Sequence, residues 1–149
     1  MARKGKPRRI ALQVWANCVI EQEKQIWGDW PVRFAFKYFH ADHSKLCGKG
    51  MDSDRTRAMF RRLKEYESKT WREMHNEKAG THFHPVDFSS SQRNEYKRGF
   101  RDQLTEDMMN LTPYQIAMTK KVRFFGVLYV GSFYVVWCDA DHDIFPESI

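Results

Sequence analysis

The sequence predicts a single α+β domain. Apolar residues recur every three or four positions near the N-terminus, whereas apolar stretches separated by turn residues fill the C-terminal third. The 149 residues are enough for one hydrophobic core, and the 42% hydrophobic and 15% aromatic contents exclude an intrinsically disordered chain. We expect an N-terminal helix, a strand and a helical pair, followed by a three-stranded antiparallel meander packed against the helices.

The first two elements are a helix and a strand. Apolar positions spaced by three and four along residues 10–27 form one helical face, and Gly28 ends the helix. Aromatic residues alternate with small or basic ones along residues 34–38, which predicts a strand that pairs with the C-terminal strands. Residues 40–51 contain two glycines and lack periodicity, so we expect a loop there.

Two helices come next. Ser53 or Asp54 is expected to cap the first, and Ser68 or Thr70 is expected to cap the second, which Gly80 ends. The first carries apolar residues on one side and arginines on the other. We expect the helices to cover one face of the sheet.

The rest of the chain predicts one helix and three strands. Residues 82–91 look irregular, but a four-residue spacing then predicts a helix with apolar positions at Tyr96, Phe100, Leu104 and Met108. The three strands are expected at residues 114–118, 122–130 and 133–137. Gly131 and Ser132 predict a type II′ hairpin turn between the last two strands.

The formal net charge of +6 resides mainly in the first nine residues. They contain five basic residues and no acidic one: Arg3, Lys4, Lys6, Arg8 and Arg9. The rest of the chain carries +1, so we expect a disordered basic arm over residues 1–9 and a nearly neutral single domain over residues 10–149. Three roles are open for the arm: an RNA contact, a tether to a ribosome or nucleoid, or a solubilising tail.

Cysteine usage and hydropathy indicate a cytoplasmic protein. Cys18, Cys47 and Cys138 are odd in number and widely spaced, and no apolar segment follows the basic start. The longest apolar run, residues 124–138, is short of the roughly 20 residues that a membrane-spanning helix needs. We therefore expect neither a disulfide framework nor a membrane partner.

The end of the chain has a distinctive order of residues, VRFFGVLYVGSFYVVWCDADHDIF. An arginine opens a strand, a hairpin and a second apolar strand follow, and an Asp, a His and an aromatic residue close the stretch. This arrangement resembles the closing half of the bacterial RelE/ParE-like toxin fold, over residues 32–39, 52–80 and 114–145. It is also similar to small bacterial and phage proteins whose second helix ends in Trp and whose final strand contains Asp.

The resemblance implies an RNA- or ribosome-directed protein, because many members of that family cut messenger RNA in the ribosome. It places Arg123 where an arginine grips the scissile phosphate, and His142 near the C-terminal acid or base. Lys120 and Lys121 would add positive charge beside Arg123. Such cleavage needs no metal or cofactor: a base deprotonates the ribose 2′-hydroxyl, a cation stabilises the phosphate and an acid protonates the leaving 5′-oxygen.

His82 and His84 form a further pair of catalytic candidates. They alternate along an extended segment, so both rings are expected to face one side. There they would serve as acid and base in RNA cleavage. The alternative is a partly exposed loop without a catalytic role.

A second basic segment has aromatic residues among its cations. Its basic residues are Arg93, Lys97, Arg98 and Arg101. Together with Lys120 they are expected to contact RNA phosphates, while Tyr96 and Phe100 stack on unpaired bases. The alternative is an amphipathic helix with both aromatic residues in the core.

His40, His43 and Cys47 have the residue types of metal ligands. A second such group consists of Cys138, Asp139 and His142. Zinc needs four converging ligands, and neither spacing matches a paired-ligand motif. The alternative is solvated histidines beside a buried cysteine.

Two functions from different classes follow. The first is a metal-independent endoribonuclease toxin, for which an antitoxin would be a partner. The second is a non-catalytic phage or mobile-element protein that binds and inhibits a host protein. Its expected contact residues are exposed aromatics, Trp27, Trp30 and Trp71.

Overall fold

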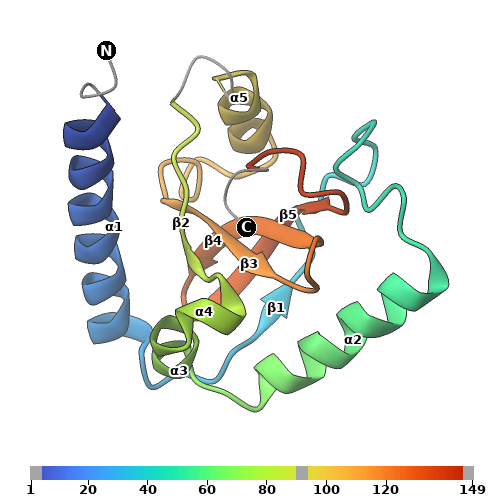
Figure 1. The fold of residues 1–149 in the computed structure, drawn as a ribbon, viewed down its shortest axis with the longest axis horizontal. Coiled ribbons are helices and arrows are strands. Elements are labelled where there is room, and N and C mark those ends of the chain that lie inside the picture. Colours follow the sequence, from blue (N-terminus) through green and yellow to red (C-terminus); the bar gives the residue numbers. More distant parts are fainter. Residues whose placement is uncertain (1–4, 90–93, 146–149) are drawn as a thin grey trace.

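The computed structural model describes residues 5–89 and 94–145, which form an α+β fold (Figure 1). The helices are α1 (Gly5–Trp27), α2 (Ser53–Glu67), α3 (Trp71–Asn76), α4 (Lys78–Thr81) and α5 (Asn94–Asp102). The strands are β1 (Phe34–Ala35), β2 (His84–Pro85), β3 (Pro113–Ala117), β4 (Arg123–Tyr129) and β5 (Ser132–Asp139). They form one sheet in the order β1-β5-β4-β3-β2. The predicted fold class is confirmed.

The predicted three-stranded meander is the centre of this sheet. β4 pairs with both β3 and β5, antiparallel in each case. The early strand joins the meander as expected, but β1 spans only two residues and runs parallel to β5, so the sheet is mixed. The segment predicted to be irregular contributes β2, which pairs with β3 at the opposite edge. A two-residue edge strand has no periodic pattern, because backbone bonds to its neighbour define it.

Two apolar layers cover the sheet, one on each face. The first contains Tyr66 of α2 together with Trp71 and Met74 of α3. The second contains Phe100 of α5 and residues from the turns around it. In Figure 1, α2 and α3 lie on one side of the sheet and α5 lies on the other. The expectation that the helices cover one face is therefore wrong, because β4 is buried on both faces and each face needs an apolar layer.

A bulge in β5 turns two consecutive side chains toward the second layer. Phe125 pairs with Trp137 and Gly126 pairs with Val135, which makes Val136 the extra residue. Val136 and Trp137 consequently both pack in the second layer, whereas Val135 packs in the first. The bulge thereby places the large Trp137 ring against α5.

The first two helices begin earlier than predicted. α1 starts at Gly5, inside the segment expected to be an arm, and ends at Trp27 as expected. The N-cap of α2 is Asp52, one residue before the predicted caps, and its Oδ1 accepts a hydrogen bond from Arg55 N at 2.7 Å. Although α1 has 23 residues, none of the helices in the described part of the chain is apolar and long enough to cross a membrane.

The helix α3 is capped by one of the two residues predicted for this role, Ser68 or Thr70. Thr70 is its N-cap, and Thr70 and Glu73 form a capping box. The helix ends at Asn76, so the prediction that Gly80 ends it is wrong. Gly80 instead lies within α4.

The β4–β5 turn is of a different type from the one predicted. Its central residues are Val130 and Gly131, and their φ angles of +50° and +77° are both left-handed, as in a type I′ turn. A Cβ at Gly131 would lie 2.2 Å from Trp30 Cε3, and Gly131 O accepts a hydrogen bond from Trp71 Nε1 at 2.8 Å. The turn therefore needs a glycine at position 131 and is strained at Val130.

We expect Val130→Asn to raise the free energy of unfolding by about 1 kcal/mol, because Asn tolerates the left-handed region better than a β-branched residue does. Val130 is 52% exposed, so the substitution forfeits little burial. Urea unfolding followed by circular dichroism measures the change. Val14→Asn, at a 57% exposed position of α1, is the matched control and should change stability little. Destabilisation by Val130→Asn would contradict the strain at this turn.

Candidate functional site

Arg123, the first residue of β4, is buried and bonds to the turn before it. It is 1% exposed. Its Nη1 donates to Thr119 O at 2.8 Å and to Val122 O at 3.2 Å, so the guanidinium holds the β3–β4 turn. Burial lowers the pKa of Arg123, and Tyr66 and Asp139 oppose that shift. The expectation that Arg123 grips a phosphate at the surface does not fit this burial.

His142 is also buried, in the turn that follows β5. It is 2% exposed and has a left-handed φ of +57°. The Asp139 carboxylate closes this turn by accepting hydrogen bonds from Asp143 N at 3.0 Å and Ile144 N at 2.9 Å. Burial raises the pKa of Asp139, while these two bonds and the charge of His142 oppose the rise. His142 is thus enclosed beside Asp139 and does not present the predicted acid or base to solvent.

His84 is held within the sheet, and Lys121 lies in an exposed turn. His84 Nδ1 donates to Pro85 O at 3.0 Å, so its Nε2 accepts from the Gln115 side-chain amide, also at 3.0 Å. Gln115 is buried, which fixes the ring at the edge of the core. Lys121 and Lys120 are both exposed between β3 and β4. The four predicted catalytic residues therefore do not share one solvent-facing surface.

His82, the partner of His84 in the sequence prediction, lies at the corner between α4 and β2. It is half-buried, and its φ of +46° is strained for a residue with a side chain. Partial burial lowers the pKa of His82, and the positive charges of nearby Arg123 and Arg62 lower it further. At neutral pH the imidazole is therefore uncharged, as a general base must be.

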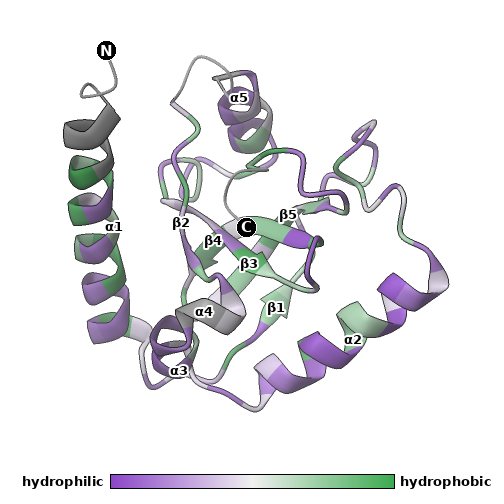
Figure 2. Cartoon of the chain, viewed as in Figure 1, coloured by the Kyte–Doolittle hydropathy of each residue, from purple (hydrophilic) through white to green (hydrophobic). Residues whose placement is uncertain are grey.

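α2 supplies the outer part of the same region. Figure 2 shows α2 as mainly hydrophilic, and Tyr66 is buried at its C-terminal end. Arg62 Nε donates to Tyr66 Oη at 3.0 Å, and Arg62 Nη2 donates to Gly80 O at 2.5 Å. Tyr66 Oη in turn donates to Ala117 O. These bonds tie α2 to the end of β3 and to the corner that carries His82.

We call Arg62, Tyr66, His82 and Arg123 the arginine–histidine cluster. The Arg62 side chain is 34% exposed and His82 is half-buried, whereas Tyr66 and Arg123 are buried. Glu65 accepts a hydrogen bond from Arg62 Nη1 at 3.2 Å and partly balances its charge. A neutral imidazole beside a guanidinium can remove a proton from a hydroxyl and stabilise negative charge that develops on a phosphate.

The sequence does not single out Arg62 or Tyr66. Arg62 is one of several arginines on an exposed helix face, and Tyr66 is one of its apolar positions. Their i, i+4 spacing is the one signal that places them side by side. The approach of His82 to both arginines has no local signal, because it depends on the corner between α4 and β2.

The predicted RNA-binding residues fall into separate parts of the chain. Arg3, Lys4 and Arg93 lie outside the described residues. Lys6, Arg8 and Arg9 lie in α1, and Lys97, Arg98 and Arg101 lie in α5. Lys120 is exposed in the β3–β4 turn.

α5 is an amphipathic helix with its aromatic residues directed to the core. Phe100 is 1% exposed, and Tyr96 is half-buried with its ring 5.9 Å from that of Trp137. The alternative prediction for these aromatics, core packing, is therefore confirmed for Phe100. The helix is shorter than predicted, and Leu104 and Met108 reach the same layer from the turns beyond it.

The residues proposed as metal ligands have other contacts. His43 Nδ1 accepts hydrogen bonds from Lys45 N at 3.0 Å and Leu46 N at 2.9 Å, and His40 Nδ1 accepts one from Trp137 Nε1 at 3.3 Å. Residues 5–89 and 94–145 contain no group of three or more His, Cys, Asp and Glu side chains arranged to hold a metal ion. Neither predicted ligand group is therefore assembled there.

The three tryptophans proposed as a protein-binding surface have different environments. Trp71 is fully buried, so that part of the expectation is wrong. Trp27 is half-buried, and its ring packs edge-on against Trp30 at 5.2 Å. Trp30 is 46% exposed and covers Gly131. They do not form one exposed aromatic patch.

Arg123→Ala is expected to lower the free energy of unfolding by about 3 kcal/mol, because two backbone carbonyls in a buried turn lose a charged donor. Thermal and urea unfolding measure the loss. Arg61→Ala, on the exposed face of α2, should stay within about 0.5 kcal/mol of the unmodified chain. Equal stability of the two variants would show that Arg123 does not hold the turn.

Comparison with known proteins gives no match. No protein-family model matches the chain, and neither a curated protein nor a solved structure does. The resemblance to RelE/ParE-like toxins therefore stays a prediction, and the function of this chain rests on its own residues and their geometry.

Proposed function

We propose that this chain is an RNA-directed protein that cleaves RNA, free or on the ribosome, at the arginine–histidine cluster without a metal ion. One arrangement carries the proposal: Arg62 Nη2 donates to Gly80 O, two residues before half-buried His82, and the charges of Arg123 and Arg62 add to burial in lowering the pKa of His82. Exposed Lys120 and Lys121 add positive charge in the turn before Arg123. RNA suits this chemistry, because each ribose offers a hydroxyl beside a phosphate.

The reaction begins with transfer of the ribose 2′-hydroxyl proton to neutral His82. The 2′-oxygen then bonds to phosphorus while the bond to the 5′-oxygen breaks. Water protonates the leaving oxygen, and the resulting hydroxide takes up the proton held by His82. The products are a 2′,3′-cyclic phosphate and a 5′-hydroxyl. Arg62 contacts the phosphate, whereas buried Arg123 acts through its charge, which adds to the effect of burial in lowering the pKa of His82.

A cytoplasmic location fits this proposal. The three cysteines are free thiols, and Cys138 is buried. Burial raises the pKa of Cys138 to about 12, so this thiol stays protonated and unreactive at neutral pH. The chain therefore needs no oxidising compartment to fold.

His82→Ala is expected to lower kcat/KM for a short single-stranded RNA at least 100-fold, because general-base catalysis is lost. Arg62→Ala should lower it by about 100-fold, since a donor to the developing phosphate charge is removed. Arg57→Ala is the matched control, because its side chain lies on the same helix and is 63% exposed.

The readout is separation of labelled fragments, with detection of the cyclic phosphate end. DNA of the same sequence should stay intact, because it lacks the attacking hydroxyl. Cleavage that survives His82→Ala but is lost in His84→Ala would move the base to the other histidine. Loss in the Arg57 control would point to a general effect of charge.

The pH profile of kcat/KM is expected to rise as His82 loses its proton, with the midpoint of the rise below 6.5, the ordinary pKa of histidine. The pKa of His82 is lowered because burial and the positive charges of Arg123 and Arg62 disfavour its protonated form. Its neutral form therefore persists to lower pH. Arg62→Ala removes one of these charges and should shift the midpoint to higher pH. An unchanged midpoint in this variant would contradict the electrostatic effect of Arg62 on His82.

A further inference from the structure

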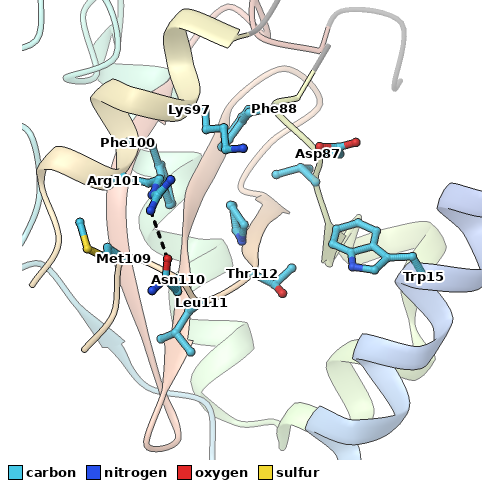
Figure 3. A pocket seen from close by; sticks show the side chains of 12 residues that line it. Trp15, Asp87, Phe88, Lys97, Phe100, Arg101, Met109, Asn110, Leu111 and Thr112 are labelled. Carbon is cyan, nitrogen blue, oxygen red and sulfur yellow. Dashed lines mark hydrogen bonds between the residues drawn. The ribbon is translucent and has the colours of Figure 1, made fainter. Parts of the chain in front are cut away.

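A second site lies apart from the cluster, in a cavity of about 300 Å³ at the other end of β2 (Figure 3). Its walls come from α5, from the segment after β2, from the turn before β3 and from one residue of α1. The lining includes the polar and aromatic residues Trp15, Asp87, Lys97, Arg101, Asn110 and Thr112. This volume is in the lower part of the range for small-molecule sites.

Aromatic and apolar side chains form much of this cavity. Phe88 and Phe100 are buried at its base, with ring centroids 5.5 Å apart. Trp15 projects from α1 toward Thr112 and Asp87, and 37% of this residue is exposed (Figure 3). A partly exposed indole facing a cavity offers a flat surface on which a ring can stack.

Two cations line the same cavity from one side of α5. Lys97 and Arg101 are four residues apart, so they share a helix face. Arg101 Nη2 donates to Asn110 Oδ1 at 3.1 Å, which orients the guanidinium along the cavity wall (Figure 3). The one acidic residue of the lining, Asp87, accepts a hydrogen bond from Ser89 N at 2.9 Å. The cavity thus has a net positive charge.

We infer that this cavity binds one nucleotide of a single-stranded RNA, with the base against Trp15 and the phosphate on Lys97 and Arg101. This inference rests on the proposed function, since it names a second contact for the same substrate. Stacking plus a nearby cation is the usual chemistry for an unpaired nucleotide. Asn110, Thr112 and Asp87 supply hydrogen-bonding groups for a base edge. The sequence predicted Lys97 and Arg101 as RNA contacts, but the stacking residue is Trp15 and not Tyr96 or Phe100.

The test measures binding separately from cleavage. Fluorescence anisotropy of a labelled ten-nucleotide RNA is recorded on the full chain carrying His82→Ala, which keeps the RNA intact. Trp15→Ala should weaken binding about tenfold, within the range for loss of one base stack. Lys97→Ala and Arg101→Ala should each weaken binding severalfold. Each should also make the negative slope of log affinity against log salt shallower by about 0.7.

Arg98→Ala is the matched control, because Arg98 is an exposed cation of α5 that does not line the cavity. It removes the same charge from the same helix and should change binding less than Arg101→Ala does. Equal losses in the two variants would overturn the inference, because binding would then follow the charge of α5 and not the cavity. Unchanged binding in Trp15→Ala would overturn the stacking contact.

Adenosine and uridine monophosphate distinguish the source of the nucleotide. If either displaces the RNA with an affinity equal to that of the RNA, and gives a protection from iodide quenching that Trp15→Ala abolishes, the occupant is a free nucleotide. If protection requires the longer RNA, the occupant is part of a strand. Cleavage by the chain with His82 intact separates the two proposals. If this chain cleaves RNA and the cavity variants bind RNA as well as it does, only this inference is wrong. If the cavity variants weaken binding but the chain does not cleave RNA, only the proposed reaction is wrong.

Discussion

β4 is buried on both of its faces, and the architecture depends on this constraint. A strand in this position needs an apolar layer on each side, so α2 and α3 cover one face while α5 and its neighbouring turns cover the other. Packing is also close along the strand itself, because a Cβ at Gly126 would lie 2.1 Å from Tyr134 O. The two helical layers therefore correspond to the two surfaces of one strand.

The same burial connects the fold to the proposed site. Arg123 opens β4, so its charge is enclosed and must be compensated by the carbonyl oxygens of the preceding turn. An enclosed charge is weakly screened, which is why Arg123 still lowers the pKa of His82. Arg62 bonds to Gly80 O, two residues before His82, and its side chain is 34% exposed. Both arginines thus lower the pKa of His82, and of the two Arg62 is the more exposed.

Helices and strands with a local signal, such as alternation, turn residues or a capping pair, could be predicted from the sequence. The meander follows from alternation and turn residues within short stretches, and α3 begins where Thr70 and Glu73 cap it. The turn type was wrong, because pairing of Tyr129 with Ser132 makes Val130 a central residue of the turn. β1 is shorter than predicted and β2 was not predicted, because the extent of each depends on backbone bonds to a longer strand.

The sequence by itself determined the α+β class, the meander, the first helix and the basic side of α5 that carries Lys97 and Arg101. Only the tertiary structure decided which charged residues are enclosed and which reach solvent. It buried Arg123 and His142, left His82 half-buried and brought Trp15 to the cavity beside α5. The physical reason is that burial and electrostatic neighbours are set by residues distant along the chain, whereas periodicity and capping report only on residues a few positions apart.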